Sequence, residues 1–286
     1  MSDPYRIDEP AVVFLSGGRT SGYMLYRILE AHEGLPDHIK VVFANTGKEM
    51  PQTLDFVRDI GERWGVDISW VEAKVRAGGE GENKYVYETV VVDHATASRD
   101  GRPFEELIIA HQYLPNPVAK FCTAELKVRR IKDHINSLGW TEWLQLIGIR
   151  ADEPRRAVKI HNQNVEGNEA YLPLYEDGIT KEDVGRFWQR QNFDLQLPNN
   201  KGVTDWGNCD LCYLKGYRKR LSIIIERPDL ADWWIRQEAR YIDSAGRGGM
   251  FRVDQPGYAK MLEFATNQGD LFDFDDDDTI PCMCTD

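Results

Sequence analysis

Short apolar runs alternate with segments of helical periodicity along the first half of this chain. Apolar runs bounded by turn residues are typical of buried strands, and apolar residues spaced three and four apart are typical of helices that pack on a sheet. Strands are expected at "AVVFL", "IKVVFANTG", "ISWVEA", "VYETVVVDH" and "WLQLIGIR". Helices are expected at about residues 22–32, 51–64 and 122–138. This order predicts a doubly wound α/β fold with a mostly parallel, Rossmann-like sheet.

Beyond about Arg156 the alternation loosens and helical segments follow. Thr180 has the character of a helix N-cap, with Asp183 three residues later, and "PDLADWWIRQEARYI" has helical spacing. We therefore expect an α/β domain over residues 1–170 and a helical C-terminal region with a Cys-x-x-Cys pair over residues 171–270. An acidic tail that contains cysteines is expected over residues 271–286.

The composition narrows the class of protein. The 286 residues carry 35 Lys and Arg against 47 Asp and Glu, a net charge of -12, which argues against a general nucleic-acid or anionic-membrane surface. The N-terminus lacks the basic and apolar regions of a signal peptide, and no apolar stretch approaches the ~20 residues that span a bilayer. A soluble, cytoplasmic protein with no membrane partner is expected.

The segment Ser16-Gly17-Gly18-Arg19-Thr20-Ser21 joins the first predicted strand to the first predicted helix. It fits neither the Gly-x-x-x-x-Gly-Lys-Ser/Thr pattern nor the Gly-x-Gly-x-x-Gly pattern of phosphate-binding loops. Adjacent glycines let the backbone form a nest of N–H donors, the serines add hydroxyl donors, and Arg19 adds a charged fork. These features predict an anion site, although the same pattern also suits an ordinary turn between a strand and a helix.

Several motifs together resemble one family. "SGGRTS" is similar to the SGGxDS-type loop of the adenine nucleotide α-hydrolase, or PP-loop ATP pyrophosphatase, superfamily. "FANTGKEMPQTLDFV" resembles the second-strand signature of its phosphoadenosine phosphosulfate (PAPS) reductase branch. "FCTAELKVRRI", "GIRADEPRR", "PLYEDGITKEDVGRFW" and "GNCDLC" follow in the family's order, so the likeness spans roughly residues 11–220. The chain is therefore identified as a PAPS reductase-like member of this superfamily.

The resemblance implies an adenine nucleotide as ligand, either ATP or the sulfonucleotides PAPS and APS, together with Mg²⁺. The phosphates are expected on the loop of residues 16–21, with further contacts from Asn45, Thr46, Gly47, Glu49 and Lys127. The first four lie at the C-terminal end of the second predicted strand, where doubly wound sheets bind ligands, but they also suit a simple turn into the next helix. Thr20 replaces the family's Asp, which leaves the geometry of the metal open.

Charged residues at the same predicted edge of the sheet are the catalytic candidates. Lys48 follows the second strand, and Arg150, Arg155 and Arg156 follow the strand "WLQLIGI". Guanidinium groups beside a phosphate site stabilise negative charge that develops at an α-phosphate or a sulfonate. The alternative is a surface network in which neighbouring acidic residues neutralise the arginines.

Five cysteines in a chain of this length do not resemble a disulfide scaffold, which favours metal or redox chemistry. Cys122, Cys209, Cys212 and a tail cysteine, assigned to Cys282, supply four sulfurs suited to an iron–sulfur cluster or structural zinc. Buried, inert cysteines are the alternative, but the resemblance favours a cluster, expected as 4Fe–4S. True reductases of the family use a Glu-Cys-Gly-type motif that this sequence lacks, so Cys284 is the candidate for a thiol that attacks sulfur.

Three functions are consistent with these residues. In the leading one, an acceptor attacks ATP at its α-phosphate, pyrophosphate leaves, and a sulfur from the cluster or a persulfide displaces AMP. The second is a sulfonucleotide reductase, in which a tail thiolate attacks the sulfonate and sulfite is released. The third is a nucleotide-binding iron–sulfur redox sensor without turnover. The sequence leaves open the identity of the sulfur acceptor, which includes a nucleic acid as a possible substrate. It also leaves open whether a sulfur donor or reductant protein takes part and whether the protein forms a homo-oligomer.

Overall fold

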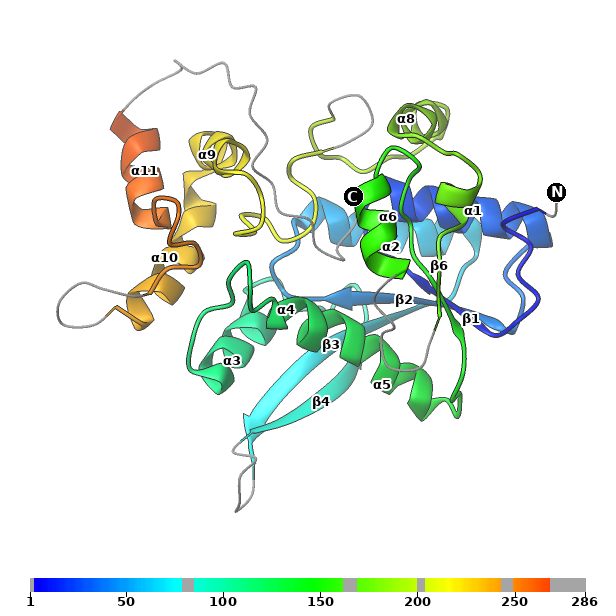
Figure 1. The fold of residues 1–286 in the computed structure, drawn as a ribbon, viewed down its shortest axis with the longest axis horizontal. Helices are drawn as coiled ribbons and strands as arrows, with labels where there is room; N and C mark the ends of the chain where they lie inside the picture. The colour runs from blue at the N-terminus through cyan, green and yellow to red at the C-terminus, as the bar shows by residue number, and fades with distance from the viewer. Residues whose placement is uncertain (1–2, 79–84, 162–168, 200–203, 243–248, 268–286) are drawn as a thin grey trace.

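A six-stranded sheet forms the centre of the computed structural model, which describes residues 3–78, 85–161, 169–199, 204–242 and 249–267. The strand order is β4-β3-β2-β1-β5-β6, and every neighbouring pair is parallel except β3 and β4 (Figure 1). The strands are β1 (Ala11–Phe14), β2 (Ile39–Asn45), β3 (Ile68–Ala77), β4 (Tyr85–Val92), β5 (Leu144–Leu146) and β6 (Ala170–Tyr171). The predicted mostly parallel sheet is confirmed.

The helices that the periodicity predicts are present, with small shifts at their ends. The first begins at Arg19 rather than near residue 22, directly after the glycine pair of the loop, and the second begins at Pro51, as predicted. The predicted helix at 122–138 contains one π-helical segment. The helices of the first part of the chain are α1 (Arg19–His32), α2 (Pro51–Trp64), α3 (Arg102–His111), α4 (Phe121–Thr123), the π-helix η1 (Ala124–Val128), α5 (Arg129–Ser137), α6 (Pro154–His161) and α7 (Pro173–Glu176).

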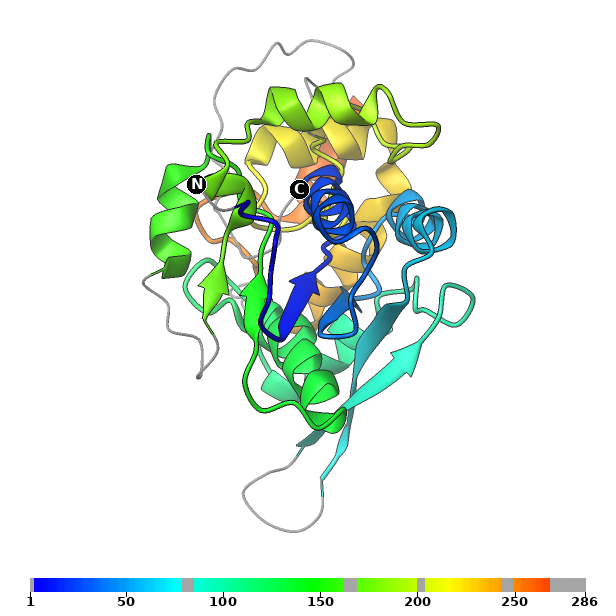
Figure 2. The same cartoon turned by 90° about the vertical axis from the view of Figure 1, so that its right-hand side faces the viewer.

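Helices cover both faces of the sheet, because alternate strand residues point to opposite sides. Val12 and Val42 share a core with Ile131 of α5. Their neighbours Val13 and Phe43 belong instead to the larger core that contains the apolar residues of α1 and α2. In Figure 2, β1 lies between α1 above it and α5 below it. The fold is therefore doubly wound, as the sequence predicts.

The edge strand β4 runs antiparallel to β3. Residues 78–84 alone separate the two strands, whereas a parallel pair needs a crossover of about a dozen residues or more. The short connection therefore gives a hairpin, in which Trp70 pairs with Val92 and Ala77 with Tyr85.

The C-terminal part of the chain is helical, as predicted. Helices α9, α10 and α11 lie together to one side of the sheet (Figure 1), and Trp234 packs against Phe251 and Tyr258 with ring centroids 5.0 and 5.2 Å apart. These helices are α8 (Lys181–Trp188), α9 (Tyr217–Glu226), the 3-10 helix η2 (Pro228–Leu230), α10 (Ala231–Arg240) and α11 (Tyr258–Asn267). None of the helices in the described ranges is long and apolar enough to cross a bilayer.

Thr180 caps α8, as predicted, and offers a first test of the fold. Its N–H and hydroxyl donate to Asp183 Oδ2 at 2.9 and 2.6 Å, and the hydroxyl bond is the main cause that lowers the pKa of Asp183. Asp183→Ala is expected to lower the free energy of unfolding by about 1 kcal/mol at neutral pH.

The loss in Asp183→Ala depends on pH, because the folded state depresses the pKa of this carboxyl. The stabilisation is complete above the unfolded pKa, about 3.9, and disappears as the pH falls through the lower folded value. Urea unfolding of both proteins between pH 7 and pH 3 measures the difference. A difference that stays constant over this range would contradict the carboxylate's role.

Candidate functional site

Three loops meet at the carboxyl ends of the neighbouring strands β5, β1 and β2. They are residues 16–21 after β1, residues 45–49 at the end of β2, and residues 147–153 after β5. Gly148 allows two of them to approach, because a Cβ at this position would lie 3.2 Å from the Cα of Ser21. The strand order runs outwards from this point in both directions, and doubly wound sheets bind ligands at such a position.

The loop of residues 16–21 is closed by its own hydrogen bonds. Ser21 Oγ accepts from the N–H of Ser16 at 3.1 Å and donates to the Gly18 carbonyl at 3.1 Å. Gly17 has φ +80°, and a Cβ there would lie 2.5 Å from Thr53 Cγ2, so this position requires glycine. Gly18 is the N-cap of α1 and has no side chain to accept from the first-turn N–H groups, an arrangement that suits an anion.

Arg19 is directed from this loop toward residues 194–197. Its Nε and Nη2 donate to the two oxygens of Asp194 at 2.7 and 2.9 Å, and Nη2 also donates to the Leu195 carbonyl at 2.5 Å. The residue is 3% exposed. The guanidinium that the sequence predicts as a phosphate ligand is engaged by Asp194 in this arrangement, and it ties the start of α1 to the segment that leads into the C-terminal region.

Arg150 reaches the same loop from the end of β5. Its Nη1 donates to Thr20 Oγ1 at 3.0 Å, and its Nη2 lies 3.4 Å from Glu153 Oε2. Glu153 also pairs with Arg156, whereas Arg155 is exposed on α6. Of the three predicted arginines, one therefore contacts the phosphate loop, one is linked to it through a carboxylate, and one lies on the surface.

The loop of residues 45–49 begins with a buried polar network. Asn45 donates from Nδ2 to Glu72 Oε1 at 2.5 Å and to the Ser98 carbonyl at 2.8 Å, while its Oδ1 accepts from the N–H of Gly47 at 3.2 Å. Glu72 also accepts from the N–H and hydroxyl of Ser98 at 2.6 and 2.8 Å. Glu72 and Ser98 are not among the predicted residues. The sequence does contain one feature that points to Glu72: it is a single acidic residue inside the apolar strand "ISWVEA", and a buried carboxylate requires polar partners.

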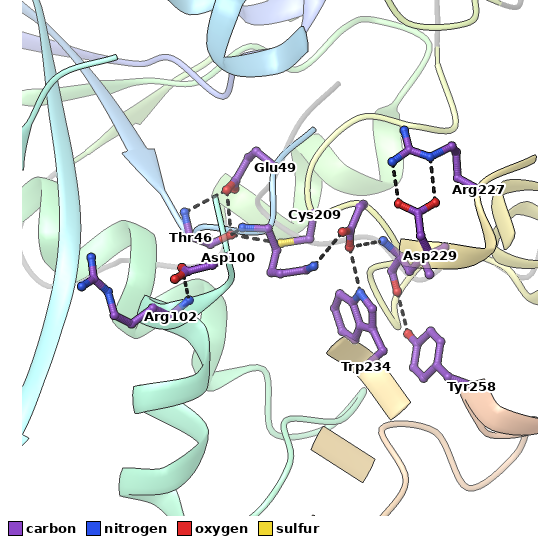
Figure 3. Close-up of polar contacts among 12 residues, drawn as sticks. Thr46, Glu49, Asp100, Arg102, Cys209, Arg227, Asp229, Trp234 and Tyr258 are labelled. Carbon is purple, nitrogen blue, oxygen red and sulfur yellow. Dashed lines mark hydrogen bonds and ion pairs between the residues drawn. The ribbon is translucent and has the colours of Figure 1, made fainter. Parts of the chain in front are cut away.

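Glu49 links this loop to the helix that carries Lys127. Its Oε2 accepts from the N–H and the hydroxyl of Thr46 at 2.9 and 2.8 Å (Figure 3), and its Oε1 lies 3.4 Å from Lys127 Nζ. The carboxylate is fully buried, so the ammonium group and the two Thr46 donors are what compensate its charge. The structure thus brings together Thr46, Glu49 and Lys127, all predicted as ligands of the nucleotide.

Lys48 joins the same loop to the Cys-x-x-Cys segment. Its Nζ lies 2.8 Å from Asp210 Oδ2, with the two side chains 9% and 5% exposed. Asp210 donates its N–H to the Lys48 carbonyl at 2.7 Å, and its Oδ1 accepts from Trp234 Nε1 at 2.8 Å. The ammonium group predicted as catalytic is therefore held in a buried ion pair. Nothing in the sequence around Asp210 indicates this partner.

The three described cysteines lie on segments that meet near this loop. Cys209 Sγ is 3.4 Å from Thr46 Oγ1 (Figure 3), Cys122 Sγ is 3.3 Å from the Tyr213 hydroxyl, and the N–H of Cys212 donates to the Cys209 carbonyl at 3.3 Å. Within the described ranges, no group of three or more His, Cys, Asp or Glu side chains is placed to hold a metal ion. The described residues alone do not fit the predicted cluster, and Cys282 and Cys284 lie outside them.

Helix α11 supports the Cys-x-x-Cys segment from the C-terminal side. The Tyr258 hydroxyl donates to the Leu211 carbonyl at 2.6 Å (Figure 3), and burial raises the pKa of Tyr258, which keeps it a donor.

An exposed ion pair lies in the same region, where Arg227 Nη2 is 2.7 Å from Asp229 Oδ2. Hydrogen bonds from Arg227 lower the pKa of Asp229.

Comparison with known families identifies the part of the chain that carries the site. The model of the phosphoadenosine phosphosulfate reductase domain matches residues 10–196. The chain belongs to this family. The PAPS reductase domain includes the loops of residues 16–21 and 45–49 and Arg150, whereas Cys209 and Cys212 lie beyond it.

The proteins that are similar to this PAPS reductase family member include two phage proteins and a solved structure. The uncharacterized nin region protein ORF290 of Escherichia phage lambda is 32% identical over 213 residues, which cover 73% of this chain and 67% of that protein. The uncharacterized 37.8 kDa protein in the gpa 5′ region of Escherichia phage 186 is 28% identical over 200 residues, 60% of this chain and 58% of that protein. The chain thus spans less than two thirds of the second relative. The crystal structure of PAPS reductase from Candida auris, a phosphate complex, matches with a TM-score of 0.38 and 18% identity, over 64% of this chain and 73% of that one.

Proposed function

We propose that this protein binds an adenine nucleotide, with ATP as the first candidate, and acts at its α-phosphate in a sulfur-transfer reaction. The observation that carries the proposal is the hydrogen bond from Arg150 to Thr20, which joins the end of β5 to the predicted phosphate loop. Membership of the PAPS reductase family supports a nucleotide ligand, and the loop's glycine backbone at the start of α1 suits phosphate groups.

In the proposed reaction, an acceptor oxygen forms a bond to the α-phosphorus as the bond to the bridging oxygen of pyrophosphate breaks. Pyrophosphate leaves onto the loop of residues 16–21, where the N-terminus of α1 stabilises its charge. The guanidinium of Arg150 stabilises charge that develops at the α-phosphate. Lys127, oriented by Glu49, supplies a second positive charge. The terminal sulfur of a persulfide on a donor protein then attacks the activated acceptor, and AMP leaves with the acceptor oxygen. A second thiol of the donor breaks the remaining S–S bond, so that the sulfur stays on the acceptor and the donor leaves as a disulfide.

A sulfonucleotide reductase is the second candidate, and the position of Cys209 favours it. This sulfur lies 3.4 Å from Thr46 Oγ1, within the loop at the end of β2, so a thiol is already present beside the proposed nucleotide site. In that reaction the thiolate attacks the sulfonate sulfur, the adenosine phosphate leaves, and a reductant later releases sulfite.

Anaerobic incubation with ATP or PAPS distinguishes these functions. Release of pyrophosphate from ATP is the expected result, whereas release of sulfite from PAPS would support the reductase, and binding without either product would support a sensor. Arg150→Met is expected to lower the rate of pyrophosphate release by about a hundredfold. Arg58→Met, which removes an arginine from an ion pair on α2, is the matched control and should leave the rate unchanged. Equal rates for Arg150→Met and the wild type would contradict the role of Arg150.

Iron content is a separate test, because the proposed reaction has no step through a cluster. If the predicted set of Cys122, Cys209, Cys212 and Cys282 binds iron, protein purified without oxygen is brown and its broad absorption fades in air. Deleting residues 279–286 is then expected to lower the iron content. Colourless protein, or zinc in place of iron, would contradict the predicted cluster.

A further inference from the structure

The contact between Arg150 and Thr20 bears on the metal that the resemblance implies. The family's loop carries an Asp where this chain has Thr20, and a carboxylate is a preferred ligand of Mg²⁺. Thr20 offers a neutral hydroxyl instead, and the residue is only 1% exposed. The hydroxyl oxygen accepts a hydrogen bond from Arg150 Nη1 at 3.0 Å. A permanent positive charge therefore lies against the atom that would face the metal.

Arg150 is fixed in this place by several contacts. Its Nε donates to Asp152 Oδ1 at 2.9 Å, its N–H donates to Glu153 Oε2 at 3.2 Å, and its Nη2 lies 3.4 Å from the same oxygen. The residue is 6% exposed. The backbone approach is tight, since a Cβ at Gly148 would lie 3.2 Å from Ser21 Cα. Moving the guanidinium away from Thr20 would break its contacts with Asp152 and Glu153 as well.

The nearby carboxylates do not replace the missing Asp as metal ligands. Glu153 is paired through one oxygen with Arg150 and through the other with Arg156, and Asp152 is paired with Arg150. A divalent cation at the two Glu153 oxygens would have to displace two guanidinium groups of like charge. The donor set next to the phosphate loop does not fit Mg²⁺.

We infer that Arg150 takes the place of the metal ion at Thr20, so that the protein binds its nucleotide in the metal-free form. This inference rests on the proposed function, because it concerns the same phosphate site. It names the form of the substrate: the free polyphosphate or sulfonucleotide anion, whose charge Arg150 and the N-terminus of α1 compensate.

Nucleotide affinity with and without metal tests this inference in the wild-type protein. Calorimetry with ATP is expected to give an affinity in EDTA at least equal to that in excess Mg²⁺, because Mg²⁺ removes the free anion from solution. Mn²⁺ added with ATP is expected to show no protein-bound metal in its electron paramagnetic resonance spectrum. An affinity that falls about tenfold or more in EDTA, or a protein-bound Mn²⁺ signal, would overturn the inference.

Two substitutions at the contact complete the design. Thr20→Asp combined with Arg150→Met restores the carboxylate and removes the guanidinium, and it is expected to make ATP binding about tenfold tighter with Mg²⁺ than in EDTA. Thr20→Asp alone retains Arg150, pairs with it, and is expected to stay insensitive to Mg²⁺. Arg150→Met alone should weaken binding under both conditions. Melting temperatures confirm that each variant is folded, and a metal response in Thr20→Asp alone would contradict the inference.

The titrations also distinguish failure of the proposed function from failure of this inference. If the folded wild-type protein binds neither ATP nor PAPS, with Mg²⁺ or in EDTA, the phosphate site itself is absent and the proposed function falls together with this inference. Binding that requires Mg²⁺ overturns this inference alone.

Discussion

Replacing Gly17 by valine is expected to abolish the binding of ATP and PAPS. Gly17 has φ +80°, a conformation that a β-branched residue adopts only under strain, and a Cβ there would lie 2.5 Å from Thr53 Cγ2 and 3.2 Å from Phe43 Cε2. The backbone must leave its present path, which displaces the N–H groups at the start of α1 from the anion. Calorimetric titration with each nucleotide measures the loss.

Gly178→Ala is the matched control for Gly17→Val. Gly178 has φ +70°, but a Cβ there would meet no atom within 4 Å, so this variant introduces the backbone strain without the close contact. It is expected to cost about 1 kcal/mol of unfolding free energy and to leave nucleotide affinity unchanged. A folded Gly17→Val protein that binds ATP as tightly as the wild type would contradict the assignment of the phosphate loop.

Asp210→Asn is expected to lower the free energy of unfolding by about 3–5 kcal/mol, the typical cost of removing one partner of a buried ion pair. The side chains of Lys48 and Asp210 are only 9% and 5% exposed in the wild-type protein. The substitution therefore leaves the ammonium of Lys48 buried without its counter-charge. It also weakens the contact between the loop of residues 45–49 and the Cys-x-x-Cys segment. Alkylation of Cys209, followed by mass spectrometry, should therefore become faster.

Two further variants identify the cause of this destabilisation. Lys48→Met combined with Asp210→Asn removes both charges and is expected to recover part of the lost stability, since no uncompensated charge stays buried. Asp229→Asn breaks an ion pair with Arg227 in which the side chains are 47% and 59% exposed, and it is expected to cost about 0–1 kcal/mol. Urea unfolding measures all of them. Equal losses in Asp210→Asn and Asp229→Asn would show that burial of the Lys48 pair is unimportant.

The order of strands and helices is readable from the sequence because it depends on local patterns. The runs "AVVFL" and "IKVVFAN" are continuous and apolar, as strands covered on both faces must be, and Val12 and Val13 do contact opposite layers. The capping of α8 by Thr180 and Asp183 is equally local. The antiparallel direction of β4 follows from a short connection, which the sequence also contains.

The phosphate loop could be located in advance for the same reason: its glycines and serines are consecutive, and their spacing alone indicates a tight turn before a helix. The contacts that give the residues of this loop their roles could not be predicted from the sequence. Arg19 looks like a phosphate ligand by its place in the loop, yet its guanidinium bonds to Asp194. Arg150 contacts Thr20 from the loop after β5, far along the chain.

Pairing between distant segments was decided by the tertiary structure. Asp210 with Lys48, and Glu72 with Ser98, are contacts whose members carry no mutual pattern in the sequence. A buried carboxylate requires a positively charged partner. The sequence offers 35 lysines and arginines for this role, and only the packing of the folded chain selects one of them. Local sequence pattern therefore determined the family, the layers and the position of the loop. Burial and three-dimensional proximity determined which side chains compensate one another, and so whether Thr20 faces a metal ion or a guanidinium.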